Sequence, residues 1–115
     1  MREWLAAREW IMGAVEDEDD TEAAIVERLK AGTAMLWLGE RSAMITEIND
    51  TEAGRVLHVW LAGGELAEVV SFTPGIAAFG RMMGCVDATL EGRKGWARAL
   101  RPYGFSGSRV LRKAL

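Results

Sequence analysis

Three short apolar runs follow one another closely in the middle of the chain, and this spacing restricts the fold more than any other feature. The runs are Ala34–Leu38, Ala43–Ile48 and Arg55–Leu61, and they are rich in residues that favour strands. The links between them are short and consist mostly of turn-forming residues. Links of this length join antiparallel neighbours, because a parallel connection needs a crossover of about a dozen residues or more. The sequence therefore predicts an antiparallel meander.

Two helices are predicted before the meander. Apolar residues recur at helical spacing from Glu3 to Val15. Thr21 offers an N-cap for a second helix over Glu22–Ala31, and Gly32 follows where a left-handed C-terminal residue is expected. The acidic run Glu16–Asp20 between the helices is typical of a solvated loop.

The second half of the chain alternates between helical and strand patterns. Gly63-Gly64 is expected to end the third strand, Glu65 to open a helix, and Thr73-Pro74 to start a new helix or introduce a kink. The remaining expected elements are a strand over Cys85–Leu90, a helix over Lys94–Tyr103 and a strand over Arg109–Leu115. This order predicts an α/β (α+β) fold with a mixed central sheet, in which the meander precedes a strand–helix–strand unit and helices cover both faces.

Composition narrows the class of protein. A chain of 115 residues is expected to form a single domain over residues 1–115. No apolar run is long enough for a membrane span, and Met1–Trp10 does not look like a secretory signal, so a cytoplasmic protein is expected. A net charge of -3 without a recognised nucleic-acid motif argues against nucleic-acid binding. The single cysteine, Cys85, and the single histidine, His58, predict no metal site.

The C-terminal part carries a family resemblance. Gly84-Cys85 opens a strand, Glu91–Trp96 reads Glu-Gly-Arg-Lys-Gly-Trp, and Tyr103-Gly104-Phe105 follows the last expected helix. Together with the order of elements, these segments resemble the GNAT acyltransferase superfamily, and specifically the short GNAT-like proteins of tailed phages and prophages. The resemblance extends from Trp4 to Leu115, without a first strand before the helices or the family's last strand. It implies a GNAT-like fold, acetyl-coenzyme A as the family's cofactor, and a place in the virion if the chain is phage-encoded.

The resemblance also implies where a cofactor would bind. GNAT enzymes hold the coenzyme A pyrophosphate on backbone N–H groups at the start of the central helix, in a glycine loop led by Arg or Gln. The matching stretch here keeps Gly63 and Gly64, the candidate cofactor-binding residues, but lacks the leading Arg or Gln. Glu65 and Glu68 stand in the first turn, where carboxylates repel a pyrophosphate.

Arg93 is a further candidate for the cofactor. It lies between two glycines at a junction of strand and helix, where its guanidinium would contact a ligand phosphate or form an ion pair with Glu91.

Candidate catalytic residues are few. Acyl transfer to an amine needs a base, and Glu47 and His58 fall on adjacent expected strands. Their alternative roles are a solvent-facing carboxylate and a hydrogen-bonded sheet histidine. Family members use a tyrosine as acid four residues before the glycine of the terminal Gly-Phe pair. That position is Leu100 here, so Tyr103 is the remaining candidate acid, with a purely structural role as its alternative.

Two hypotheses follow. The first is a GNAT-like accessory or virion-associated protein whose acyl-coenzyme A site is degenerate, which uses no cofactor and acts through protein contacts. The second is an active N-acetyltransferase that moves an acyl group from acetyl-coenzyme A to an amine. Sheet edges left open in a short domain also predict a protein partner or self-association, for example a dimer that continues the sheet.

Overall fold

The computed structural model describes residues 1–91, 96–107 and 110–115 of the chain. Its helices are α1 (Arg2–Ala14), α2 (Glu22–Ala31), α3 (Leu66–Ser71), α4 (Thr73–Met82) and α5 (Trp96–Leu100), followed by a short 3₁₀ helix over Arg101–Tyr103. The strands are β1 (Ala34–Leu38), β2 (Ser42–Thr51), β3 (Gly54–Gly64), β4 (Cys85–Glu91) and β5 (Val110–Ala114). The predicted order of elements is therefore confirmed.

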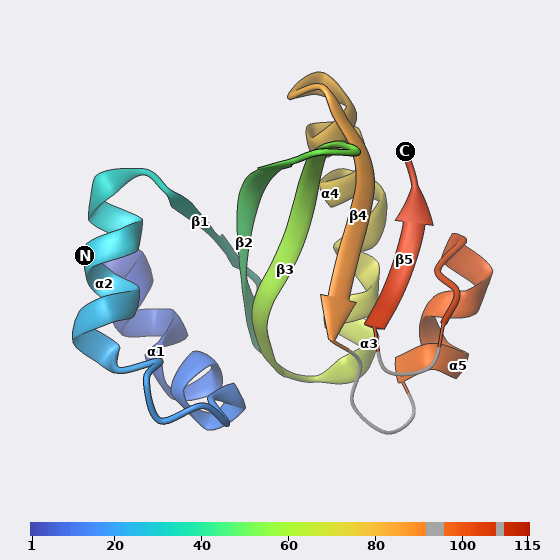
Figure 1. Ribbon diagram of the computed structural model, residues 1–115. Coiled ribbons are helices and arrows are strands. Elements are labelled where there is room, and N and C mark those ends of the chain that lie inside the picture. The colour runs from blue at the N-terminus through green and yellow to red at the C-terminus, as the bar shows by residue number, and fades with distance from the viewer. Residues whose placement is uncertain (92–95, 108–109) are drawn as a thin grey trace.

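The strands form one mixed sheet in the order β1-β2-β3-β4-β5 (Figure 1). β1, β2 and β3 make the expected antiparallel meander. β3 and β4 are parallel, with α3 and α4 as the crossover between them, and β5 returns antiparallel to β4. The predicted combination of a meander and a strand–helix–strand unit is thus confirmed.

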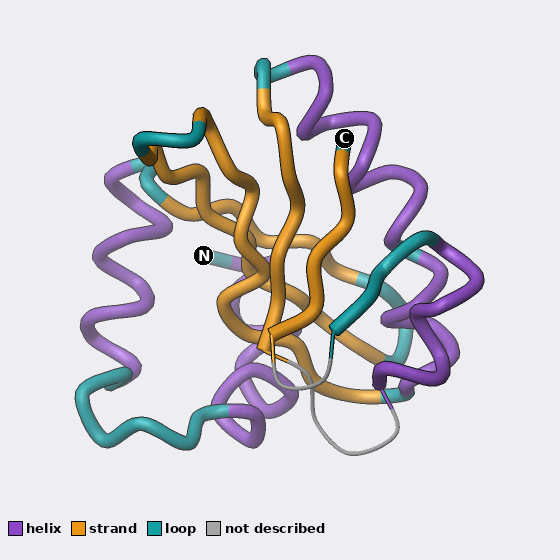
Figure 2. The backbone as a smooth tube through the Cα atoms, turned by 45° about the vertical axis from the view of Figure 1, so that its right-hand side comes forward, coloured by secondary structure: helices purple, strands orange, loops and turns teal. Residues whose placement is uncertain are grey.

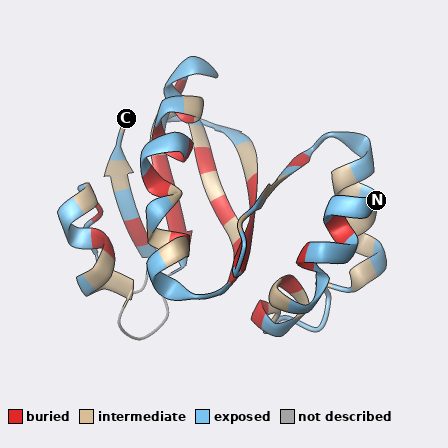
Figure 3. Cartoon of the chain, turned by 180° about the vertical axis from the view of Figure 1, so that it is seen from behind, coloured by how far each residue is buried: buried red, intermediate tan, exposed pale blue. Residues whose placement is uncertain are grey.

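Helices cover both faces of this sheet, as predicted (Figure 2). On one face α1 and α2 enclose a core with the apolar side chains of β1, β2 and β3; its fully buried members include Ala7, Ile11, Ile25 and Ile45. On the other face α3, α4 and α5 enclose a second core, which includes Leu57, Val59, Ile76, Leu90 and Leu111. Figure 3 shows the buried residues on the helix surfaces that face the sheet and along the central strands.

The helix signals in the first part of the sequence act as predicted. Ala24 N–H donates to the Thr21 hydroxyl at 3.2 Å, so Thr21 is the N-cap of α2. Gly32 ends α2 in the left-handed conformation with φ 78°. The acidic loop is less solvated than expected at its end, because Asp20 is half-buried and accepts a hydrogen bond from the Trp60 indole N–H at 3.3 Å.

The expected end of the third strand was wrong. β3 continues through both glycines, with Gly63 opposite Ala43 and Gly64 opposite Ser42 in the antiparallel ladder. The strand continues because of a tertiary contact: β2 begins at Ser42, so its first residues pair with the two glycines. The preceding turn is also tighter than expected: β2 runs to Thr51 and β3 begins at Gly54.

The predicted break at Thr73-Pro74 is present between α3 and α4. Thr73 lies inside α4, and its hydroxyl donates to Val70 C=O at 2.7 Å. Phe72 precedes α4, and Pro74 occupies the first turn, where its missing N–H costs nothing.

The C-terminal helix is shorter than predicted among the described residues. α5 spans Trp96–Leu100, and the chain then tightens into the 3₁₀ turn that ends at Gly104 with φ 91°. In the ranges that the structure describes, no helix is both long and apolar enough to cross a membrane.

Candidate functional site

Three polar side chains lie in a row across neighbouring strands. Glu47 on β2 is the direct cross-strand partner of His58 on β3, and His58 is in turn opposite Thr89 on β4. His58 Nδ1 and Thr89 Oγ1 are 2.8 Å apart. Because Arg28 of α2 contacts Glu47, the row lies on the sheet face that α1 and α2 partly cover. The structure thus brings together the two residues predicted as candidate bases.

Glu47 is occupied by its neighbours. Its carboxylate forms an ion pair with the Arg28 guanidinium, and Asn49 Nδ2 lies 3.5 Å from its other oxygen. The Glu47 side chain is 13% exposed, and the Arg28 guanidinium stacks 4.4 Å from the centre of the Trp60 ring. A carboxylate held in this way is better placed to fix α2 on the sheet than to accept a proton from a ligand.

His58 is the better placed of the two candidates. When Nδ1–H donates to the Thr89 hydroxyl, Nε2 carries the lone pair and can accept a proton. The half-buried ring sits on the sheet face beside the point where β3 and β4 separate. Parallel pairing ends at Val59 opposite Leu90, while β3 continues to Gly64 with only β2 beside it among the described residues. The catalytic roles of His58 and Glu47 remain predictions.

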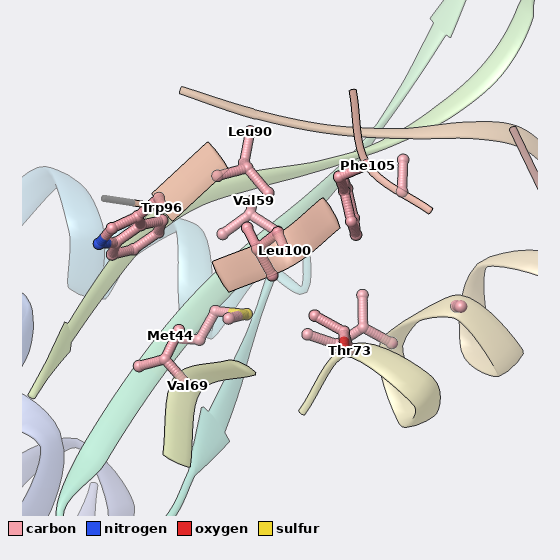
Figure 4. A pocket seen from close by; sticks show the side chains of 11 residues that line it. Met44, Val59, Val69, Thr73, Leu90, Trp96, Leu100 and Phe105 are labelled. Carbon is pink, nitrogen blue, oxygen red and sulfur yellow. The ribbon is translucent and has the colours of Figure 1, made fainter. Parts of the chain in front are cut away.

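A small apolar cavity lies on the opposite face, below this separation. Val59, Leu90 and Leu100 converge on it, and Trp96 and Phe105 close it from the α5 side (Figure 4). Its volume is about 20 Å³, which is room for roughly one water molecule. Side chains of this chain therefore already fill most of the space behind the separated strands.

Leu100 accounts for part of that filling. It is 3% exposed and points into the cavity, at the position where the family resemblance would place an acidic tyrosine (Figure 4). Tyr103 ends the 3₁₀ turn, is half-buried, and packs against the core on the α3, α4 and α5 side. The sheet separates that core from the face of His58 and Glu47, so the structure does not gather the three predicted catalytic residues at one point.

The two candidate cofactor glycines have structural reasons to be glycine. A Cβ at Gly63 would lie 2.9 Å from the Trp10 carbonyl carbon, because α1 packs its backbone against β3 there. Gly64 has φ +104°, and a Cβ on it would lie 2.5 Å from Ser42 Cα. Close packing on α1 and on the start of β2 explains both residues without a ligand.

The start of α3 is bound to the turn between β1 and β2. The Glu68 carboxylate accepts hydrogen bonds from Arg41 N–H, at 3.0 Å, and from the Ser42 hydroxyl. These bonds lower the pKa of Glu68, the Ser42 hydroxyl most and the Arg41 N–H next. Arg41 also forms an ion pair with Glu65 at 2.8 Å, and its carbonyl accepts from Glu65 N–H at 3.0 Å.

The Glu68 carboxylate occupies the space beside the turn between β1 and β2. A Cβ at Gly39 would lie 2.6 Å from Glu68 Cδ, so the glycine makes room for the carboxylate. We refer to Glu65 and Glu68 with Arg41 and Ser42 as the α3 latch. It places two carboxylates at the helix start where the family resemblance implied a pyrophosphate.

Several functional contacts were not expected from the sequence. Thr89 is a polar residue between the apolar Ala88 and Leu90 of β4, and that exception was the available signal. The links from Arg28 to Glu47 and from Ser42 to Glu68 join residues distant in sequence, and no local pattern marks them. Arg93, the third predicted cofactor ligand, lies outside the described residues. Within the described parts of the chain, no group of three His, Cys, Asp or Glu side chains is arranged to hold a metal ion.

Comparison with known proteins identifies the fold. No protein-family model matches the sequence, and no curated protein matches it significantly. Among solved structures, a mutant agmatine N-acetyltransferase in its apo form superimposes with a TM-score of 0.64 at 13% identity, covering 100% of this chain and 92% of that one. A GNAT-family acetyltransferase from Listeria monocytogenes gives 0.60 at 17% identity, covering 90% and 79%.

A third similar structure is a GNAT-family acetyltransferase from Brucella melitensis in complex with acetyl-coenzyme A. It has a TM-score of 0.62 at 16% identity, covering 99% of this chain and 80% of that one. At these identities the likeness concerns the fold alone: the chain has a GNAT-like mixed sheet flanked by helices.

Proposed function

We propose that this chain is a GNAT-fold protein that has lost the family's acyl-coenzyme A site and works through protein contacts. The observation that carries the proposal is the α3 latch. Glu68 already accepts the hydrogen bonds of Arg41 N–H and the Ser42 hydroxyl, and Glu65 pairs with the Arg41 side chain. A pyrophosphate approaching this helix start would meet two carboxylates, which repel it.

Two further features agree with a lost site. The acid position of the family is occupied by Leu100, whose buried side chain lines the cavity of about 20 Å³. Gly63 and Gly64 are fixed by packing against α1 and β2. With two carboxylates at the helix start and little room for an acyl arm among the described residues, the fold serves as a scaffold. The phage resemblance of the C-terminal motifs makes an accessory or virion-associated role our specific proposal.

Thermal denaturation with acetyl-coenzyme A tests the loss of the site. A ligand at a hundredfold excess over its Kd would stabilise the folded state by about 2.7 kcal/mol, a shift in Tm of roughly 10 °C for a domain of this size. We expect no shift at millimolar acetyl-coenzyme A, with an active GNAT enzyme as the positive control. A saturable shift in the native protein would refute the proposal.

The protein-contact role needs its own test. If the chain is encoded by a phage or prophage, mass spectrometry of purified particles is expected to detect it, and a deletion of its gene should leave particles that lack it but are otherwise complete. Particles that never contain the chain would rule out virion association.

The alternative is an active N-acetyltransferase with acetyl-coenzyme A as donor and an amine as acceptor. The observation in its favour is His58, which bonds Thr89 beside the separation of β3 and β4 and has Nε2 available as a base. Release of free coenzyme A in the presence of amines would support it, provided that His58→Ala abolishes the release and Asn49→Ala, an exposed neighbour on the next strand, does not.

A further inference from the structure

The two edges of the sheet differ in whether their outward backbone groups are paired and in the charge that they carry. Along β5, the outer backbone groups of Arg112 are already paired: Ser106 N–H donates to Arg112 C=O at 3.0 Å, and Arg112 N–H donates to Ser106 C=O at 2.9 Å. β5 also carries Arg112 and Lys113, so two such strands side by side would bring like charges together. This edge is closed by the chain and protected by charge.

The edge formed by β1 has neither protection. In the hairpin, Gly39 N–H donates to Ser42 C=O at 2.9 Å. Backbone N–H and C=O groups alternate in direction along an antiparallel strand. The backbone groups of Trp37 and Met35 therefore also face β2. Those of Ala34, Leu36 and Leu38 face outward. Among the described residues β1 pairs with β2 alone. Its five residues, Ala-Met-Leu-Trp-Leu, carry no charge.

We propose that two copies of this chain associate through β1, antiparallel and with the two-fold axis at Leu36. In this register Leu36 lies opposite the partner's Leu36, and Ala34 lies opposite the partner's Leu38. The residues that face outward are then the ones that meet, so their N–H and C=O groups satisfy one another across the axis. The result is an isologous dimer with one sheet running through both copies.

The side chains of β1 suit this register. Met35, which is 43% exposed, comes opposite the partner's Trp37 on the face of α4. Trp37 is half-buried there, with an edge-to-face contact to Phe79, and the methionine would cover part of its exposed ring. On the other face the small Ala34 meets Leu38, which is 40% exposed. Self-pairing therefore buries the two exposed apolar side chains of this strand and opposes no like charges.

The proposal does not depend on whether the acyl-coenzyme A site is lost. In the sheet, β2 and β3 lie between β1 and the point where β3 separates from β4. A dimer that binds acetyl-coenzyme A would contradict the proposed function alone, and a monomer that does not bind it would contradict the dimer alone.

Sedimentation velocity from low to high micromolar concentration is the first test, and we expect a reversible monomer–dimer equilibrium. Met35→Glu places a carboxylate against the negative face of the Trp37 ring twice per dimer and should raise the dissociation constant roughly tenfold or more. The matched control is Val110→Glu, which adds the same charge to an exposed position of the other edge strand and should leave the constant unchanged. Leu38→Pro, which removes one outward N–H and none toward β2, should weaken the dimer as well.

Amide hydrogen exchange on the native chain covers the case in which a variant fails to fold. Protection of the Leu36 and Leu38 amides should rise with protein concentration, while that of the Arg112 amide should not change. The proposal is overturned by a monomer at every concentration, which would leave the edge to a strand of another protein. It is equally overturned by a dimer that tolerates Met35→Glu and shows no concentration-dependent protection in β1.

Discussion

Replacing Gly63 by alanine distinguishes a packing glycine from a cofactor glycine. α1 crosses β3 at this point, and the added Cβ would lie 2.9 Å from the Trp10 carbonyl carbon, with the carbonyl oxygen closer still. Ordinary contact begins at 3.4 Å, so the difference between 3.4 and 2.9 Å requires α1 to withdraw by at least about 0.5 Å. Both clashing atoms belong to the backbone and cannot turn aside.

The expected cost follows from what α1 buries. Overpacking in a well-packed core costs about 1–3 kcal/mol. Withdrawal of α1 also loosens Trp4, Ala7 and Ile11, which are at most 4% exposed against the sheet, so we expect the upper part of that range. A domain of this kind has a free energy of unfolding of about 5–15 kcal/mol, so the loss is a substantial fraction of the total.

Urea denaturation followed by circular dichroism measures this loss. With a slope of about 1.5 kcal/mol per molar urea, Gly63→Ala should lower the midpoint by roughly 1.5–2 M, in the absence of any acetyl-coenzyme A. The control is Gly13→Ala on α1 itself, where a Cβ meets nothing within 4 Å. Because glycine weakens a helix relative to alanine, that variant should gain up to about 1 kcal/mol.

The same chemical change is thus expected to have opposite signs at two glycines. A Gly63→Ala protein as stable as the native one would show that α1 does not press on β3. The explanation of Gly63 by packing would then be wrong, and the glycine would again need a ligand to account for it.

Three further predictions concern single side chains. Leu100→Ala should destabilise by about 2–5 kcal/mol, because the residue is buried beside an existing cavity, whereas Leu5→Ala, at a side chain 70% exposed, should change stability by less than about 0.5 kcal/mol; equal urea midpoints would contradict this. The pKa of Glu68 is lowered by the Ser42 hydroxyl and the Arg41 N–H, so its contribution to stability is present above the ordinary pKa of 4.5 and lost as the pH falls through the lowered value; Glu68→Gln should flatten the acid side of the stability–pH curve, and parallel curves would argue against the α3 latch. Burial raises the pKa of the Cys85 thiol, so alkylation at pH 8 should be much slower in the folded protein than in urea, and equal rates would place Cys85 at the surface.

The sequence by itself determined the order and type of the elements. Helical periodicity, the Thr21 cap, the left-handed Gly32 and the short links of the meander are all signals between residues close in the chain. The replacement of the family's tyrosine by Leu100 was also readable from the sequence, because it required only counting four residues back from the glycine of the terminal Gly-Phe pair. These features led to the GNAT-like fold because a short link or a cap restricts the local backbone whatever the rest of the molecule does.

Only the tertiary structure decided what the site residues do. Gly63 and Gly64 were expected to end a strand and cradle a phosphate, yet they continue β3 because α1 and β2 approach them. Glu68 was expected to repel a ligand, and the structure adds that it binds Arg41 and Ser42 instead. Such contacts depend on strand register and helix placement, which bring together residues that no local pattern relates. The sequence predicted open sheet edges without telling which edge is open. Among the described residues, the pairing of Ser106 with Arg112 covers the β5 edge and leaves β1 open.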